Sequence, residues 1–280
     1  MKSKFLLNRE KKFSNICSNF KFEKISNLVV SHKIKPSLFN KLTKSINKYI
    51  IKNKKYKFAN LTPNGKLIPK KENQTEFNEV VKDYRNIILS LNFFKDINKW
   101  VMPSIRYKDP KINKLNKNRS SRSELLHCDV WAGWDPNSIL VQIPILGDTT
   151  NNRIRYYDIP NDINNNWLRK KNFLSAQKNF ASRCIPLKHH YKKGYIYVSD
   201  IIVTHKTERL KNSKSRVSID IPILLGKNKT YRKFGITDLI DPKKMETLGK
   251  KYVLECLLHM GQIDGKSEKK VPSTCVFTKK

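Results

Sequence analysis

The feature that most constrains the fold of this chain is a series of short segments between residues 100 and 226 that have the residue pattern of β-strands. One of them, residues 124–131, has no helical period and contains no Gly or Pro. Residues two apart in a strand share a face, so His127 and Asp129 are expected to point the same way while Cys128 points away. On a helix, two residues at this spacing would diverge and could not easily bind one ion.

Two later segments carry further polar residues in a strand-like setting. Residues 201–205 form a β-branched run that ends in His205. Residues 215–223 alternate polar and apolar side chains, which places Arg216 and Ser218 on one face. Val217 and Ile219 are then expected to pack on the other face. The sequence thus predicts that three strands bring polar groups to one place.

Two imidazoles and one carboxylate, His127, Asp129 and His205, are suited to binding one metal ion. Such a set occupies one side of a ferrous ion and leaves open positions for a bidentate acid and for dioxygen. Arg216 would complement it, because a planar guanidinium pairs with a carboxylate better than an ammonium does. The chain has 46 Lys and only 12 Arg, so an Arg at this position stands out from the background.

These residues carry a family resemblance over about residues 100–225. The stretch 127–134, His-Cys-Asp-Val-Trp-Ala-Gly-Trp, and the strand 137–145 ending in Ile-Pro-Ile resemble iron(II)/2-oxoglutarate-dependent oxygenases. Within that superfamily they are most similar to the streptomycin-biosynthesis type. The stretch from Gly194 through His205 to Asp220 resembles the second half of the same family.

The resemblance implies a site, two cofactors and a reaction. His127, Asp129 and His205 would bind Fe(II), and Arg216 and Ser218 would bind the distal carboxylate of 2-oxoglutarate. The implied reaction consumes dioxygen, converts 2-oxoglutarate to succinate and CO2, and by default hydroxylates a substrate. Desaturation or ring closure would use the same residues.

Four further residues near these motifs have alternative interpretations. Gln142 would bind the keto acid or form a cross-strand pair. Arg106 would contact the substrate or the carboxylate of 2-oxoglutarate, or have a surface or structural role. Trp131 and Trp134 would form a substrate wall or pack in the barrel.

The predicted fold class is mainly β with flanking helices, built on a double-stranded β-helix (jelly roll). Such a fold brings inward-facing residues together at one opening. We expect three parts: an N-terminal helical and basic extension, the oxygenase core, and a C-terminal helical extension with a tail. Their ranges are 1–99, 100–226 and 227–280.

Local patterns predict the individual elements. Apolar residues at helical spacing predict one helix around Leu38–Ile50 and a second over 74–98. Residues 1–35 show no strong hydrophobic period, and a short strand is expected at 28–30. The strands are expected at 100–107, 139–145, 153–159, 185–189, 195–199 and 216–225, with a helical insertion at 167–182.

The composition limits the setting of the protein. Five Cys without a repeated spacing argue against a disulfide framework. No signal peptide or membrane-spanning run is predicted, so a soluble cytoplasmic protein is expected. The net charge of +35 comes mostly from dispersed Lys, in a chain rich in Asn and Ile. We interpret this charge mainly as compositional bias. Even so, the positive charge would attract anionic substrates.

Three classes of function remain open from the sequence. The first is an iron/2-oxoglutarate oxygenase for a small metabolite bearing a sugar, aminocyclitol or phosphate. The second applies the same chemistry to a nucleic acid or a protein. The third is a non-catalytic binding module on the same fold, which the complete ligand set argues against. The oligomeric state is not predicted.

Overall fold

The computed structural model describes most of the chain up to residue 224. The described ranges are 1–18, 20–55, 57–58, 61–62, 64–67, 73–91, 99–100, 103–110, 122–169 and 171–224. The predicted C-terminal extension at 227–280 lies outside these ranges, as do residues 111–121.

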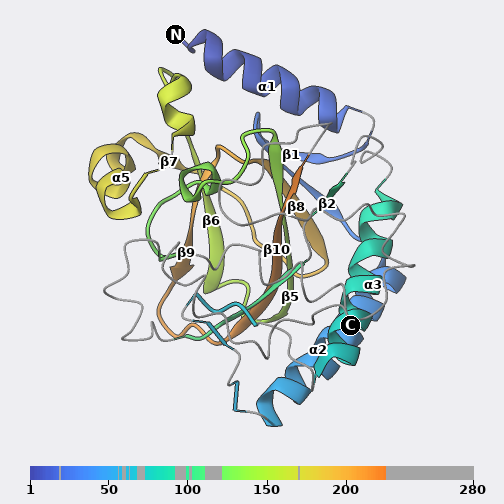
Figure 1. Ribbon diagram of the computed structural model, residues 1–280. Coiled ribbons are helices and arrows are strands. Elements are labelled where there is room, and N and C mark those ends of the chain that lie inside the picture. The colour runs from blue at the N-terminus through green and yellow to red at the C-terminus, as the bar shows by residue number, and fades with distance from the viewer. Residues whose placement is uncertain are drawn as a thin grey trace, which may run out of the picture.

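Two antiparallel sheets form the core (Figure 1). The main sheet has the strand order β1-β2-β8-β5-β10-β3, with β4 also paired to β10. The minor sheet has the order β7-β6-β9. The strands of the main sheet are β1 (Glu23–Ser26), β2 (Val29–Lys33), β3 (Lys99–Trp100), β4 (Ser104–Lys108), β5 (Ser138–Gly147), β8 (Tyr195–Asp200) and β10 (Arg216–Leu224). Those of the minor sheet are β6 (Asn152–Asp158), β7 (Ile185–Pro186) and β9 (Thr204–Arg209).

The path of the chain between the sheets defines the fold. It runs from β4 in the main sheet to an isolated bridge between His127 and His205 of the minor sheet, then back to β5. It continues through β6 and β7 in the minor sheet to β8, β9 and β10, which alternate between the sheets. This is the topology of a double-stranded β-helix, and it confirms the predicted fold class.

β10 shows why the two faces of the main sheet differ. Its apolar residues Val217, Ile219 and Ile221 are almost fully buried in the apolar core. The residues between them, Arg216 and Ser218, belong to the opposite face, as the alternation predicts.

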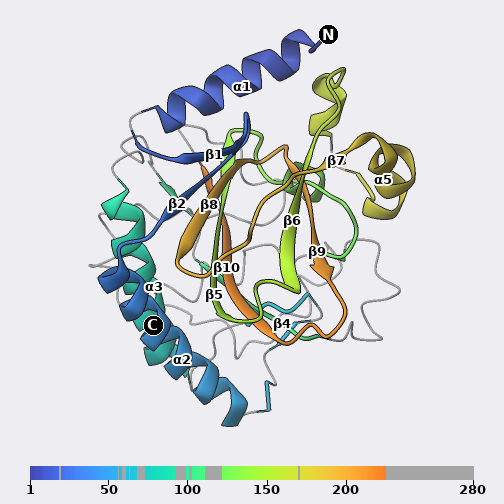
Figure 2. The same ribbon diagram turned by 180° about the vertical axis from the view of Figure 1, so that it is seen from behind.

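Two amphipathic helices flank the main sheet on the side of β2 and β8 (Figures 1 and 2). They are α2 (Pro36–Lys55) and α3 (Gln74–Ser90), and they pack together through contacts such as Tyr49 against Phe77. Their buried stripes confirm both predicted helices, although residues 92–98 of the second lie outside the described ranges. The segment before residue 99 also adds β1 and β2 to the main sheet.

A third helix, α1 (Lys4–Cys17), was not predicted from the sequence. It crosses one end of the barrel (Figure 1) and buries Leu6, Arg9 and Phe13. Because the charged Arg9 lies in this buried stripe, the apolar residues alone do not show a helical period. In the structure the Arg9 guanidinium donates to the Asp200 carboxylate and to the carbonyl of Pro136.

Several predicted strands differ in extent. The expected strand at 124–131 is reduced to the bridge at His127, because the 3-10 helix η3 (Asp129–Ala132) begins two residues later. β9 starts at Thr204, after a turn in which Asp200 accepts from the backbone N–H of Ile202, and it extends beyond the predicted segment 201–205 to Arg209. β7 covers only two residues of the predicted 185–189.

The predicted helical insertion consists of three short pieces. These are η4 (Asn165–Leu168), α5 (Phe173–Phe180) and η5 (Ala181–Arg183). Asn172 caps α5 by accepting from the backbone N–H of Leu174. Among the described helices, none has the length and apolar character needed to cross a membrane.

The ion pair between Arg9 and Asp200 should be a main anchor of α1. Both side chains are largely buried, so removing one partner leaves the other charge without compensation. We expect Arg9→Ala to lower the free energy of unfolding by about 3 kcal/mol, measured by urea denaturation. Lys11→Ala, on an exposed position of the same helix, is the control and should change it by less than about 0.5 kcal/mol. Equal effects of the two variants would contradict this anchoring role.

Candidate metal centre

The predicted metal ligands converge in the structure. The backbones of His127 and His205 exchange two hydrogen bonds, with N···O distances of 3.1 and 2.7 Å, and their ring centroids lie 4.6 Å apart. Asp129 joins them from the first position of η3, and its Oδ1 lies 3.9 Å from Nε2 of His127. One potential ligand atom from each residue lies within 4.8 Å of the other two. The three side chains can therefore hold a single metal ion.

The start of η3 explains how Asp129 reaches the two imidazoles. Cys128 between the ligands has extended backbone angles, φ −121° and ψ 154°. His127 and Asp129 therefore still project to the same side, although the chain turns immediately afterwards. Cys128 projects away from them and is completely buried. His127 and Asp129 therefore point to the same side, as predicted, although the strand expected at 124–131 ends at this point.

Backbone carbonyls orient both imidazole rings. Nδ1 of His127 lies 2.7 Å from the carbonyl oxygen of Leu125, and Nδ1 of His205 lies 3.2 Å from that of Val203. A carbonyl oxygen only accepts, so each Nδ1 carries the proton and each Nε2 has a free lone pair. This arrangement leaves Nε2 of both rings available to a metal.

Burial favours the neutral form of His127 and of Asp129 when no metal is bound. It lowers the pKa of His127 well below its usual value, and the neighbouring His205 lowers it further. Burial also raises the pKa of Asp129, an effect that His205 partly offsets. A divalent cation would supply the positive charge that the Asp129 carboxylate lacks in this buried setting.

Arg216 is a buried guanidinium with unsatisfied donors in the interior. Only 1% of it is exposed, and among the described residues neither Nε nor Nη1 has a hydrogen-bond partner. Its guanidinium carbon lies 5.4 Å from the ring centroid of Tyr191. Unpaired buried donors of this kind are costly, and they suit an anionic ligand that would accept from them.

Ser218 and Gln142 lie on the main sheet next to Arg216. Ser218 follows it on the same face of β10 and is 2% exposed. Gln142 on β5 is 1% exposed, and its Oε1 accepts from the hydroxyl of Tyr156 on β6. This contact crosses the interior from one sheet to the other. The Gln142 carbonyl is therefore used within the protein.

Arg106 forms an ion pair on the inner face of the barrel. Its Nε donates to both carboxylate oxygens of Asp220, at 2.8 and 3.1 Å, and the two residues come from the paired strands β4 and β10. The guanidinium also affects the metal ligands, because it opposes protonation of His127 and lowers the pKa of Asp129. Arg106 therefore lies near the metal ligands and also makes a structural cross-strand contact with Asp220.

The two Trp residues differ in their placement. Trp131 has no exposed surface, its Nε1 donates to the carbonyl of Trp167, and its ring packs on Trp167 and Phe180. These are the contacts of a core residue, in agreement with the packing alternative. Trp134 is half-buried, and its backbone N–H donates to the carbonyl of the ligand Asp129.

Sequence reasoning missed four residues around the site. Phe173 stacks on His127 with ring centroids 4.5 Å apart and planes 17° apart. Tyr191 lies against Arg216, and Tyr156 is the cross-strand partner of His205. Lys108 pairs with Arg216 across β4 and β10. For Lys108 alone a local signal existed, because Arg106 and Lys108 alternate with the apolar Ile105 on one strand.

Comparisons with known proteins give structural likenesses only. The sequence matches no protein-family model and no curated protein. Among solved structures, the chain is similar to SnoK, a non-heme alpha-ketoglutarate-dependent carbocyclase from nogalamycin biosynthesis, with a TM-score of 0.45 and 9% identity over 76% of this chain and 89% of that one.

Two further structures are similar to a comparable degree. The non-heme monooxygenase ThoJ gives a TM-score of 0.41 and 12% identity over 77% of each chain. An N-substituted L-amino acid dioxygenase from Burkholderia ambifaria gives 0.39 and 11% over 77% of this chain and 87% of that one. These TM-scores are all below one half, so the superpositions are too loose to transfer residue roles.

The geometry predicts that the full chain binds one divalent ion through His127. Calorimetric titration of the metal-free protein with Co(II) should show one site. His127→Ala should weaken that site by more than about a hundredfold, because even groups that only orient a ligand contribute about ten- to a hundredfold. His190→Ala, at an exposed position, is the control and should bind like the wild type. Equal Co(II) affinity in the two variants would argue against this metal centre.

Proposed function

We propose that the protein is an Fe(II)/2-oxoglutarate-dependent oxygenase that acts on a small molecule. The observation that carries the proposal is the placement of the two-His, one-Asp cluster and of Arg216, with its unpaired donors, in one β-barrel interior. The two-His, one-Asp cluster would bind a metal cation, and Arg216 would bind an anion. The proposal therefore rests on the residues of this chain.

The donor set fits ferrous iron. His127 and His205 offer two neutral nitrogens and Asp129 offers one carboxylate oxygen, which is the facial set found in non-heme iron oxygenases. Three ligands leave positions open for a bidentate cosubstrate and for dioxygen. Bound there with 2-oxoglutarate, iron supplies the oxidation of a substrate C–H bond, with succinate and CO2 as the products of the cosubstrate.

Arg216 fits the distal carboxylate of 2-oxoglutarate. A guanidinium can donate two parallel hydrogen bonds to one carboxylate, and burial strengthens such a pair. Burial lowers the pKa of Arg216, while Tyr191 and Asp220 favour its charged form. In our proposal Arg216 holds the cosubstrate, Ser218 adds a hydroxyl donor, and Tyr191 positions the guanidinium.

The finer part of the proposal concerns the subtype and the substrate. The His-x-Asp-x-Trp motif at 127–131 and the following Ile-Pro strand suggest an enzyme of the streptomycin-biosynthesis type. Its substrate would then be a small metabolite that bears a sugar, an aminocyclitol or a phosphate. In our proposal the half-buried Trp134, two residues after η3, borders that substrate, and Gln142 orients the cosubstrate through its amide group.

The test of the proposed function is the consumption of 2-oxoglutarate. Succinate formed in the absence of a primary substrate can be measured before that substrate is known. We expect succinate from the full chain with Fe(II), 2-oxoglutarate, ascorbate and air, and none when Fe(II) is replaced by Co(II). Anaerobic calorimetry of the Co(II)-loaded protein gives an independent readout of 2-oxoglutarate binding. Failure of both measurements would refute the proposal.

Arg216→Lys should weaken 2-oxoglutarate binding more than it disturbs the fold. Lysine keeps the charge and loses the bidentate geometry. A lost hydrogen bond between charged groups corresponds to about tenfold to a hundredfold in the dissociation constant of the Co(II)-loaded protein. Arg183→Lys, at an exposed arginine paired with Asp162, is the control. Unchanged 2-oxoglutarate affinity in Arg216→Lys, with an unchanged melting temperature, would place the anchor elsewhere.

Tyr191 should act on the same binding step through its ring. Tyr191→Leu removes the aromatic face beneath the guanidinium and should weaken 2-oxoglutarate binding about threefold to thirtyfold. Tyr191→Phe keeps the face and should bind within about twofold of the wild type. Co(II) affinity should be the same in both variants, because Tyr191 offers no ligand to the metal. Equal loss in the two variants would assign the effect to the hydroxyl.

A further inference from the structure

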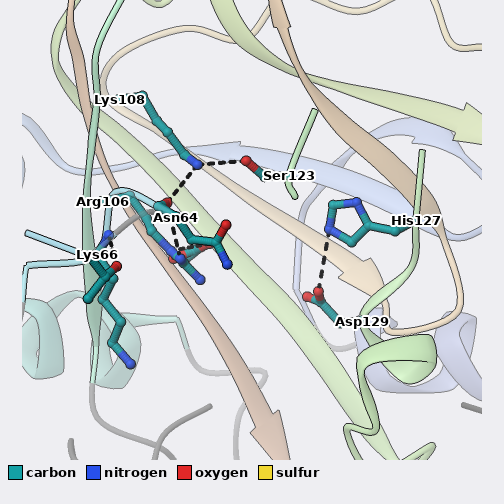
Figure 3. A network of polar contacts seen from close by, with 9 residues as sticks. Asn64, Lys66, Arg106, Lys108, Ser123, His127 and Asp129 are labelled. Carbon is teal, nitrogen blue, oxygen red and sulfur yellow. Dashed lines mark hydrogen bonds and ion pairs between the residues drawn. The ribbon is translucent and has the colours of Figure 1, made fainter. Parts of the chain in front are cut away.

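A row of cations lines the inner face of the main sheet beside the metal centre. The register of β4 and β10 places Lys108 opposite Arg216 and Arg106 opposite Ser218. Directly opposed residues of an antiparallel pair share a face, so these side chains are neighbours. Lys66 forms a backbone bridge opposite Arg106, but its amine points away from that of Lys108 (Figure 3). Lys66 and Lys108 are 2% and 5% exposed.

The contacts of Lys108 leave its charge without a carboxylate partner. Its Nζ donates to the carbonyl of Asn64 at 2.7 Å and to Oγ of Ser123 at 2.6 Å, and both acceptors are neutral (Figure 3). Among the described residues, the two nearby acids are paired with other cations, Glu124 with Arg209 and Asp220 with Arg106. Burial and the charge of Arg106 lower the pKa of Lys108 to about 7.

Lys108 lies close to the metal ligands. Its charge, like that of Arg106, contributes to the lowered pKa of His127. The backbone also connects the two places, because the carbonyl of Ser123 accepts from the N–H of Thr207, two residues after His205. Figure 3 shows the Lys108 amine and Ser123 on one side of the interior, with His127 and Asp129 across from them.

The side chains of Lys108 and Arg216 start as cross-strand neighbours but reach in different directions. The Arg216 guanidinium lies over Tyr191, whose ring packs 4.9 Å from that of Tyr197 on β8, beyond β5. Lys108 instead reaches away from β5, toward Asn64 and Ser123. A keto acid that chelates the metal has one distal carboxylate to offer. If Arg216 binds that carboxylate, the keto acid has no further anionic group to pair with Lys108.

We propose that Lys108, beside Arg106, binds an anionic group of the primary substrate, a carboxylate or a phosphate. The inference rests on the proposed function and names the substrate class of the same site. An ammonium has three N–H donors, of which two are used, so the third is available to the ligand. The anchored end of the substrate would lie at β4 and its reacting carbon at the metal centre.

The test measures the binding of simple anions to the full chain. Calorimetric titrations use methyl phosphate and acetate at constant ionic strength, with methanol as the neutral probe. We expect Lys108→Met to weaken the tighter-binding anion by about tenfold or more, because a charged donor is lost. Lys211→Met, at an exposed position, controls for the general attraction of a basic protein and should bind like the wild type. The preferred probe tells a phosphate from a carboxylate substrate.

A second pair of variants protects the test against a failure of folding. Lys108→Arg keeps the charge and should retain anion binding, whereas Lys108→Gln should lose it. Unchanged anion affinity in Lys108→Met and Lys108→Gln would overturn the proposal.

The same variants separate this inference from the proposed function. In the Co(II)-loaded protein, Lys108→Met should keep 2-oxoglutarate affinity within about threefold of the wild type, since that carboxylate belongs to Arg216. A loss equal to that of Arg216→Lys would show that Lys108 serves the cosubstrate, and would overturn the inference alone. Anion binding that depends on Lys108 in a protein that binds no 2-oxoglutarate would support the anion site and refute the proposed function.

Discussion

The paired backbone hydrogen bonds between His127 and His205 are the constraint on which the metal centre depends. They make the two imidazoles cross-strand neighbours, and the extended Cys128 then brings Asp129 to the same side. Because side chains alternate along a strand, a shift of one residue in this register would turn His205 away from the interior. The rest of the double-stranded β-helix fixes that register, since β9 is held along its length by β6.

The interior around this pair is polar and carries more positive charge than its acids neutralise. Asp220 and Glu124 are paired with Arg106 and Arg209, while Arg216 and Lys108 have no carboxylate partner among the described residues. Buried unpaired charges destabilise a folded protein, so a bound anion would stabilise this one. The side chains of the two cations reach in different directions, Arg216 over Tyr191 and Lys108 toward Asn64 and Ser123, which is the arrangement expected if the cosubstrate and the substrate each bring a negative group.

Elements with a regular apolar pattern could be predicted from the sequence. The stripes of α2 and α3 and the alternation in β10 are local signals that the structure confirms. α1 was missed because Arg9 occupies a buried position, and its partner Asp200 lies 191 residues away. The strand expected at 124–131 ends early because a 3-10 helix begins at Asp129, where Trp131 turns into the core beside Trp167.

The sequence by itself determined which chemical groups the site contains, since His127, Asp129, His205 and Arg216 stand in segments whose local pattern is that of strands. It also determined that Arg216 and Ser218 share a face, because alternation is a property of a single strand. Only the tertiary structure decided which residues face these groups. Three examples join segments far apart in the chain. Tyr191 lies beneath Arg216, the Tyr156 hydroxyl donates to Gln142, and Lys108 is paired with Arg216 in strand register. Their positions follow from strand pairing and register, which no local pattern specifies.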